Sequence, residues 1–225
     1  MFDRIAPRYD LLNRMLSLRQ DVAWRNRMAR YLPAGENLRI LDVATGTADQ
    51  IFSLLRREPR VASAVGVDMA ERMLEVGRAK AAERGLADRV SLRTGDATQI
   101  PEPSGTYDAV SISFGIRNVM DVVQALGEMR RVLRPGGRVL VLEFSLPRLA
   151  PLRGLYLFYL RHFLPVLGGL LSGDREAYRY LNVTVETFPY GEAFCDLMRK
   201  AGLVQVQHHP LTLGIATIYQ GDAPA

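Results

Sequence analysis

The chain has 225 residues, of which 48% are hydrophobic, and a formal net charge of +5. At this length we expect one domain or two very small ones, with roughly 70% of the unfolded surface buried, so that neither disulfides nor a structural metal is needed. The single cysteine, Cys195, excludes an internal disulfide, and no Cys/His cluster has the spacing of a zinc site. The composition therefore excludes a disulfide scaffold, a collagen and a disordered chain, and we expect no bound metal.

Short apolar strands alternate with helical patterns from residue 39 onward, which is typical of a parallel sheet covered by helices. In chain order the pattern predicts strands at 39–44, 64–68, 90–94, 107–113 and 138–144, with helices at 49–57, 70–84 and 119–133. Strands at 204–208 and 214–219, joined by a turn around Pro210, predict a final antiparallel hairpin. The predicted fold is α/β, a Rossmann-like doubly wound sheet, mostly parallel with an antiparallel C-terminal strand. Such sheets bind ligands at the carboxyl ends of their strands.

Two segments lie outside this alternation, and with the sheet they form one predicted domain over residues 1–225. We expect residues 1–33 to form a helical arm and residues 147–188 to form a helical lid, both packed over the ligand edge of the sheet. Within the lid, a group of residues is apolar on nearly all sides, which an exposed helix tolerates only when something apolar covers it. The group consists of Leu155, Tyr156, Leu157, Phe158, Tyr159, Leu160, Phe163 and Leu164. A polyprenyl tail, a membrane surface or the second copy of a homodimer would each provide this apolar cover.

Neither the first residues nor the most apolar stretch predicts export or membrane insertion. Residues 1–4 include an acidic and a basic side chain where a secretory signal would be apolar. Residues 149–171 are apolar, but Arg153, Arg161 and His162 divide them into runs too short to span a bilayer. We expect a cytoplasmic protein, with peripheral association at the inner face of the cell membrane as an open alternative.

The stretch DVATGTAD at 42–49 follows the first strand and opens a helix, where nucleotide-binding loops lie. Of the three glycines of a dinucleotide loop it keeps Gly46, with Ala44 and Ala48 at the other two places. Because those glycines let the backbone approach a pyrophosphate, their loss favours a ligand without phosphates. S-adenosylmethionine, which carries an adenosine, an amino acid and a sulfonium, is such a ligand, and S-adenosylhomocysteine would be its product.

Aspartates at three successive strand ends fit this ligand. Asp68 follows Gly46 by 22 residues, the spacing at which a carboxylate accepts hydrogen bonds from ribose hydroxyls. Asp96 is placed to bond the adenine amino group, and Asp42 to hold the ammonium of the methionine part. One aspartate alone is as readily a strand end or a helix cap, but three in this order indicate a cofactor site.

Five motifs of the chain resemble those of the class I S-adenosylmethionine-dependent methyltransferases: ILDVATGTAD, VGVDMAERML, GDATQIP, YDAVSISFGIRNV and RVLRPGGRVLVLEFS. The last two, with the leading FDRIAPRYDLLNRMLSLRQDVAWR and the later YRYLNVTVETFP, resemble the quinone-biosynthesis C-methyltransferases in particular. The resemblance covers nearly the whole chain. The sequence departs from the family at Arg19, where members usually have glycine, and at Ala48, which replaces a glycine found in many of them.

The resemblance implies C-methylation of a prenylated hydroquinone ring, either demethylmenaquinol to menaquinol, the corresponding benzoquinol step of ubiquinone biosynthesis, or both. It also implies that the donor contacts residues of the strand-end motifs. With the loop residues considered above, the expected cofactor-binding set is Asp42, Gly46, Thr47, Asp68, Met69, Asp96, Ala97 and Ser113.

Arg117 in FGIRNV and Tyr9 in the arm are the candidates for catalysis at the acceptor. A ring carbon becomes a better nucleophile when its hydroxyl loses proton density, so a group that stabilises the phenolate helps. Arg117 is no free base, because the guanidinium of arginine stays protonated in water. We therefore expect it to orient a water or stabilise the phenolate, and an ion pair with Asp121, four residues on, is the structural alternative. Glu143 is expected as a supporting partner of the arm.

Alternatives from other classes stay open. Another class I small-molecule or lipid methyltransferase would share the fold, as would a noncatalytic S-adenosylmethionine-binding subunit of a quinone-synthesis complex.

Nucleic acid is not an expected partner, because no helix carries a dense basic stripe with interleaved aromatics. The basic excess lies in residues 1–31, at +4, and 148–180, at +3, against −2 elsewhere. That placement favours an anionic membrane surface.

Overall fold

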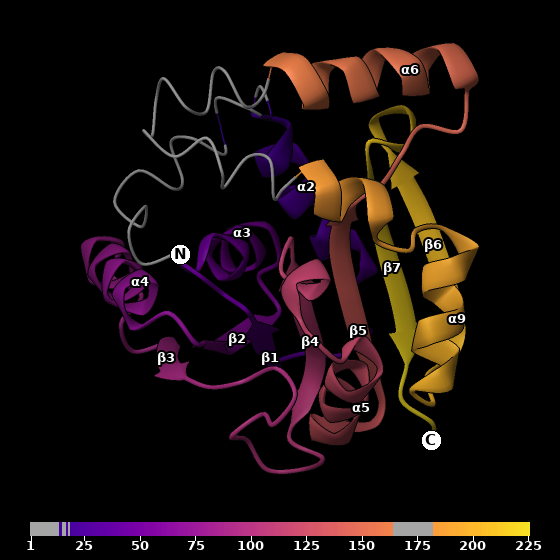
Figure 1. The fold of residues 1–225 in the computed structure, drawn as a ribbon. Coiled ribbons are helices and arrows are strands. Elements are labelled where there is room, and N and C mark those ends of the chain that lie inside the picture. Colours follow the sequence, from indigo (N-terminus) through magenta and orange to yellow (C-terminus); the bar gives the residue numbers. More distant parts are fainter. Residues whose placement is uncertain (1–13, 15–16, 18, 164–181) are drawn as a thin grey trace.

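The computed structural model describes residues 14, 17, 19–163 and 182–225. A seven-stranded sheet lies at its centre, in the order β3-β2-β1-β4-β5-β7-β6 (Figure 1). The strands are β1 (Leu38–Val43), β2 (Val61–Asp68), β3 (Val90–Thr94), β4 (Tyr107–Ser113), β5 (Leu133–Phe144), β6 (Val204–Leu211) and β7 (Ala216–Asp222). β1 to β5 pair in parallel, and β7 runs antiparallel to both β5 and β6. The predicted fold class and the antiparallel C-terminal strand are thus confirmed.

Helices cover both faces of the sheet. One face carries α2 (Gln20–Met28), the short η1 (Ala29–Tyr31), α3 (Asp49–Arg57) and α4 (Glu71–Glu83), and the other carries α5 (Val122–Val132) and α9 (Glu192–Lys200). Strand residues alternate between the two cores, so that Ile40 and Leu140 face α3 while Leu41 and Val139 face α5. The chain steps from β1 outward to β3 and then returns to β4 beside β1. This reversal is the point at which open α/β sheets bind ligands.

The apolar insertion begins as α6 (Ala150–Phe158) and continues as one π-helical segment, η3 (Tyr159–Phe163). Figure 1 shows α6 lying across the end of the sheet to which β5 points. Leu160 and Leu146 pack with Val185 in a small core of their own beneath it. In the part of the chain that the structure describes, no helix is long and apolar enough to cross a membrane.

The position of the last turn was predicted wrongly. Pro210 lies within β6, opposite Thr217, and the chain reverses at η4 (Thr212–Gly214). β6 is an edge strand, where a residue without a backbone N–H is tolerated. The helix predicted at 119–133 is also shorter, because the Asp121 carboxylate accepts from the backbone N–H of Gln124 and starts α5 there.

The described part of the arm packs against the carboxyl ends of β4 and β5. Trp24 of α2 lies against Phe114, with ring centroids 6.1 Å apart, and against Phe144, at 6.2 Å. Its indole N–H donates to Thr212 Oγ1 over 2.8 Å. Before α2, Arg19 has φ 62° and ψ 11°, the left-handed conformation that glycine adopts most easily. Arg19, one of the departures from the family's glycines, thus occupies a conformation that suits glycine.

Arg19→Gly is expected to raise the free energy of unfolding by about 1 kcal/mol, because a residue with a Cβ is strained in the left-handed region. Arg27 is exposed like Arg19 but lies inside α2. Arg27→Gly should therefore lower the free energy of unfolding by about 1 kcal/mol. Urea denaturation of both variants measures the difference, and a loss of stability in both would contradict the strained turn.

Candidate active site

The loop after β1 has an unusual backbone. Ala44, Gly46 and Ala48 have φ angles of 49°, 54° and 65°, so both alanines occupy left-handed conformations. Such conformations are costly for alanine and are retained mainly where the surrounding structure enforces them, often at functional sites. A Cβ placed on Gly46 would meet no atom within 4 Å. The loop thus leaves open space above Gly46, as a bound ligand requires.

Asp68 joins this loop to the next strand end. Its Oδ2 accepts from the backbone N–H of Gly46 over 2.8 Å, and its Oδ1 accepts from that of Ala70 over 2.9 Å at the start of α4. Met69, beside it, is 72% exposed, so its apolar side chain is accessible to a ligand. The structure therefore brings three predicted cofactor residues, Gly46, Asp68 and Met69, to one place.

Asp96 and Ala97 lie on the turn that follows β3. The backbone N–H of Gly95 donates to the backbone oxygen of Asp68, which holds this turn beside the site. Asp96 Oδ1 accepts from the Thr98 backbone and hydroxyl, and these bonds hold the pKa of Asp96 below its usual value. The Asp96 side chain is exposed, and Ala97 packs partly against the core. The contacts of both residues with a cofactor stay predictions.

Asp42 is the least accessible member of the predicted set. It is 1% exposed, and its oxygens accept from the hydroxyls of Thr45, at 2.7 Å, and Ser111, at 2.5 Å. Burial raises the pKa of Asp42 to about 6, although these two hydroxyls act in the opposite direction. Asp42 thus supports the loop from beneath, and its contact with the ammonium of a cofactor stays a prediction.

Lys80 reaches the loop from α4. Its ammonium donates to Thr47 Oγ1 over 3.0 Å and to Asp49 Oδ1 over 2.5 Å, while Arg14 bonds the other oxygen of Asp49 at 3.2 Å. Burial alone would raise the pKa of Asp49, but these cations outweigh it and leave the pKa below its usual value. Thr47 is only 3% exposed, so the structure places it at the loop as part of this network.

Arg117 lies just beyond β4, on the short η2 (Ile116–Asn118). Its Nη1 donates to Glu143 Oε1 over 2.6 Å and to the backbone oxygen of Phe114 over 2.8 Å. The alternative ion pair with Asp121 is wrong, because Asp121 caps α5. Glu143 pairs with Arg117, and its expected contact with the arm, most of which lies outside the described residues, stays a prediction. Arg117 Nε is buried without a hydrogen-bond partner, as is Asn118 Oδ1. Asn118 was missed in the sequence, where only its place in FGIRNV marks it.

Ser113, at the end of β4, donates its hydroxyl to Gln50 Oε1 over 3.1 Å. This hydrogen bond joins the end of β4, which leads to Arg117, to α3. Tyr9, the second catalytic candidate, lies outside the described residues, so its role stays a prediction.

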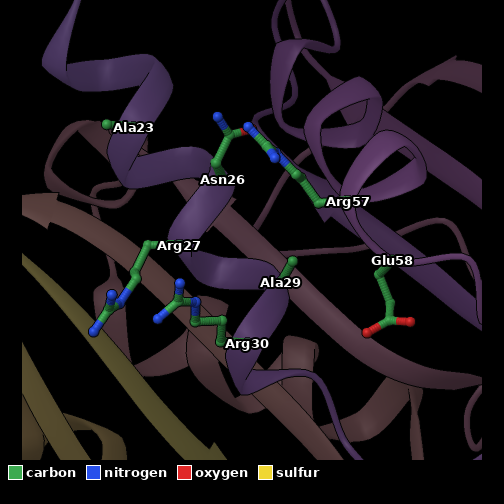
Figure 2. A pocket seen from close by; sticks show the side chains of 7 residues that line it. All are labelled: Ala23, Asn26, Arg27, Ala29, Arg30, Arg57 and Glu58. Carbon is green, nitrogen blue, oxygen red and sulfur yellow. The ribbon is translucent and has the colours of Figure 1, made fainter.

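The pocket drawn in Figure 2 is not the candidate site described above. It measures about 450 Å³ and lies between α2 and the end of α3 (Figure 2). None of the predicted site residues is among those that line it: Ala23, Asn26, Arg27, Ala29, Arg30, Arg57 and Glu58.

One group of described side chains has metal-ligand types close together. Donor atoms of Glu192, Cys195 and His208 lie within 4.8 Å of one another. Burial, however, raises the pKa of the Cys195 thiol to about 11, and Arg199 pairs with Glu192. Because metals bind thiolate, this environment opposes metal binding. The absence of a metal nevertheless stays a prediction.

Solved structures share the fold of this chain. An S-adenosylmethionine-dependent methyltransferase of Thermotoga maritima superposes with a TM-score of 0.67 at 18% identity, covering 99% of this chain and 100% of its own. Phosphoethanolamine N-methyltransferase 2 of Haemonchus contortus, solved with S-adenosylmethionine, gives 0.65 at 14% identity over 92% of this chain and 52% of its own. The fold is that of the class I S-adenosylmethionine-dependent methyltransferases.

Sequence comparison identifies the family within this class. The model of the ubiE/COQ5 methyltransferase family matches residues 1–222. Demethylmenaquinone methyltransferase of Thermus thermophilus is 48% identical over 100% of both chains. Ubiquinone/menaquinone biosynthesis C-methyltransferase UbiE of Geotalea daltonii is 46% identical over 99% of this chain and 94% of its own. The chain belongs to the ubiE/COQ5 methyltransferase family and is an S-adenosylmethionine-dependent methyltransferase.

The raised pKa of Asp42 makes stability depend on pH. Because folding favours its protonated form, its contribution is full below pH 4 and is lost as the pH rises through about 6. The loss amounts to about 3 kcal/mol for a shift of this size. Asp42→Asn should remove this decline in the free energy of unfolding between pH 4 and 7, measured by urea denaturation. The exposed Asp88→Asn is the control, and an unchanged pH profile in Asp42→Asn would contradict the assignment.

Proposed function

We propose that this protein transfers the methyl group of S-adenosylmethionine to a ring carbon of a prenylated hydroquinone, in menaquinone biosynthesis, ubiquinone biosynthesis or both. Relatives that share 46–48% of its residues carry names for these reactions. The observation that carries the proposal is the buried Arg117, which lies beyond β4 with an unpartnered Nε. A buried N–H donor at the ligand edge suits an acceptor that carries an oxygen.

The residues at the strand ends would hold the donor. Asp68 is bonded to the Gly46 loop and suits the ribose hydroxyls, while the exposed Asp96 suits the adenine amino group. Met69 offers an exposed apolar surface for the adenine ring. Once bound, S-adenosylmethionine supplies an electrophilic methyl group on a sulfonium whose leaving group needs no proton. The protein therefore mainly aligns donor and acceptor.

Arg117 would act on the acceptor. A guanidinium at hydrogen-bond distance from a ring hydroxyl stabilises the phenolate and so raises electron density at the neighbouring carbon. A guanidinium stays protonated in proteins and does not act as the base, so the proton leaves to water or to another group. Asn118, whose Oδ1 is buried and unpartnered beside it, is a further acceptor for a hydroxyl or a water.

An apolar tail would lie along the lid. Leu149, Leu155, Phe158 and Phe163 of this segment are between 52% and 66% exposed, and Val183 is 60% exposed. Such a cluster of exposed apolar side chains is typical of a surface that meets lipid or an apolar ligand. The exposed Arg148 and Arg153 lie close by in the sequence. We therefore place the protein in the cytoplasm, with the lid against an anionic membrane that holds the substrate; a homodimer through the lid is the alternative.

Arg117→Lys tests the acceptor role. The ammonium keeps the charge but loses the planar fork, so we expect kcat on a prenylated quinol to fall about 100-fold while the affinity for S-adenosylmethionine stays within twofold. Transfer of labelled methyl measures the first and calorimetry the second. Arg153→Lys, on the exposed lid, is the control. Unchanged turnover in Arg117→Lys would contradict the proposal.

The double variant Leu155→Ser, Phe158→Ser tests whether the lid binds the prenyl tail of the substrate. If these exposed side chains hold the prenyl chain, KM for a long-tailed quinol should rise roughly 10-fold or more, because apolar area is lost from the complex. Activity on a tail-free quinol should not change. Leu213→Ser, which alters an equally exposed leucine on η4, is the matched control. A wild-type enzyme that treats both quinols equally would contradict the role of the lid.

A further inference from the structure

Glu143 is a buried charge that the proposed reaction does not yet use. It is 1% exposed and stands next to the last residue of β5. Its Oε1 accepts from Arg117 Nη1 over 2.6 Å and from the backbone N–H of Phe144 over 2.8 Å. Its Oε2 lies 3.5 Å from the backbone nitrogen of Arg117. One carboxylate thus holds both the side chain and the main chain of Arg117.

These contacts fix the direction of the guanidinium. Nη1 carries two hydrogens, and both are engaged, one by Glu143 and one by the backbone oxygen of Phe114. The Arg117 Cζ lies 5.3 Å from the centroid of the Phe144 ring, which supports one face of the group. Because the guanidinium is a rigid planar fork, fixing Nη1 also fixes where Nε–H points. That N–H is the one buried without a partner.

Among the described residues near Arg117, no other side chain serves as its counter-ion in place of Glu143. The carboxylate of Asp121 caps α5. The charges of Arg117 and Glu143 both act on the pKa of Tyr156 in α6. Burial has the larger effect, which raises this pKa and keeps Tyr156 a neutral phenol. The Arg117 side chain is only 8% exposed, and a buried guanidinium without a counter-ion is strongly unfavourable.

We propose that Glu143 is the positioning residue of the acceptor site, which holds Nη1 of Arg117 so that Nε–H faces the substrate oxygen. The inference rests on the proposed function for the nature of that oxygen. Glu143 itself touches no substrate and acts through Arg117. Its loss should therefore lower kcat by about 100-fold, the effect of a misplaced catalytic group, with little change in KM.

A double-mutant cycle with chemical rescue tests this in the full-length enzyme. Glu143→Gln should lower kcat on a prenylated quinol, yet add no loss in the Arg117→Ala background, since its effect passes through the arginine. Free guanidinium ions should restore part of the activity of Arg117→Ala but not of the double variant, which lacks the carboxylate that holds them. Equal rescue of both, or additive losses, would overturn the proposal.

A second readout needs no turnover. In nitrogen NMR spectra of the arginine side chains, Arg117 should show a slowly exchanging, rotationally fixed Nη1 that is lost in Glu143→Gln. Glu186→Gln, which removes the exposed pair with Arg161, is the control and should keep that signal. If Glu143→Gln fails to fold, Glu143→Asp, which keeps the charge but shortens the side chain, replaces it in both experiments.

The two readouts separate the hypotheses. A wild-type enzyme that methylates no quinol but whose Arg117 signal depends on Glu143 would contradict the proposed function and leave the positioning role supported. A quinol methyltransferase whose Arg117 signal and kcat survive Glu143→Gln would overturn the positioning role alone.

Discussion

The buried ion pair between Arg117 and Glu143 is the constraint on which the acceptor side of the site depends. This ion pair links the segment after β4 to the end of β5 at the carboxyl edge of the sheet, where β4 and β5 are neighbours. Breaking either partner would leave an uncompensated charge in a region that is more than 90% buried. The pair therefore sets the position of Arg117 Nε, which is buried without a hydrogen-bond partner.

The donor side is organised by a second buried acid. Asp42 stands opposite Ser111 in the pairing of β1 with β4, and from there it fixes the loop whose backbone takes three left-handed angles. Asp68 then ties that loop to β2. Both sides of the site thus depend on carboxylates of parallel strands, those of Asp42 on β1, Asp68 on β2 and Glu143 on β5, which is why a parallel sheet serves as the scaffold.

Much of this followed from the sequence, and the failures have physical causes. Strands at 90–94 and 107–113 and the helix at 49–57 match the structure because local periodicity decides them. The partner of Arg117 was missed because it lies 26 residues away, on another strand, and sequence proximity favoured Asp121. The burial of Asp42 could not be predicted from the sequence either, because it depends on hydroxyls that tertiary contacts bring to the carboxylate. Pro210 was read as a turn because its tolerance in β6 depends on the edge position of that strand.

Carbon methylation of a quinol ring is the central claim, and the position of the transferred methyl tests it most directly. The protein would be incubated with S-adenosylmethionine carrying a carbon-13 methyl group and with prenylated naphthoquinol and benzoquinol, and the product examined by NMR. We expect a labelled methyl bonded to a ring carbon of at least one quinol. A label on oxygen, or on neither quinol, would contradict it.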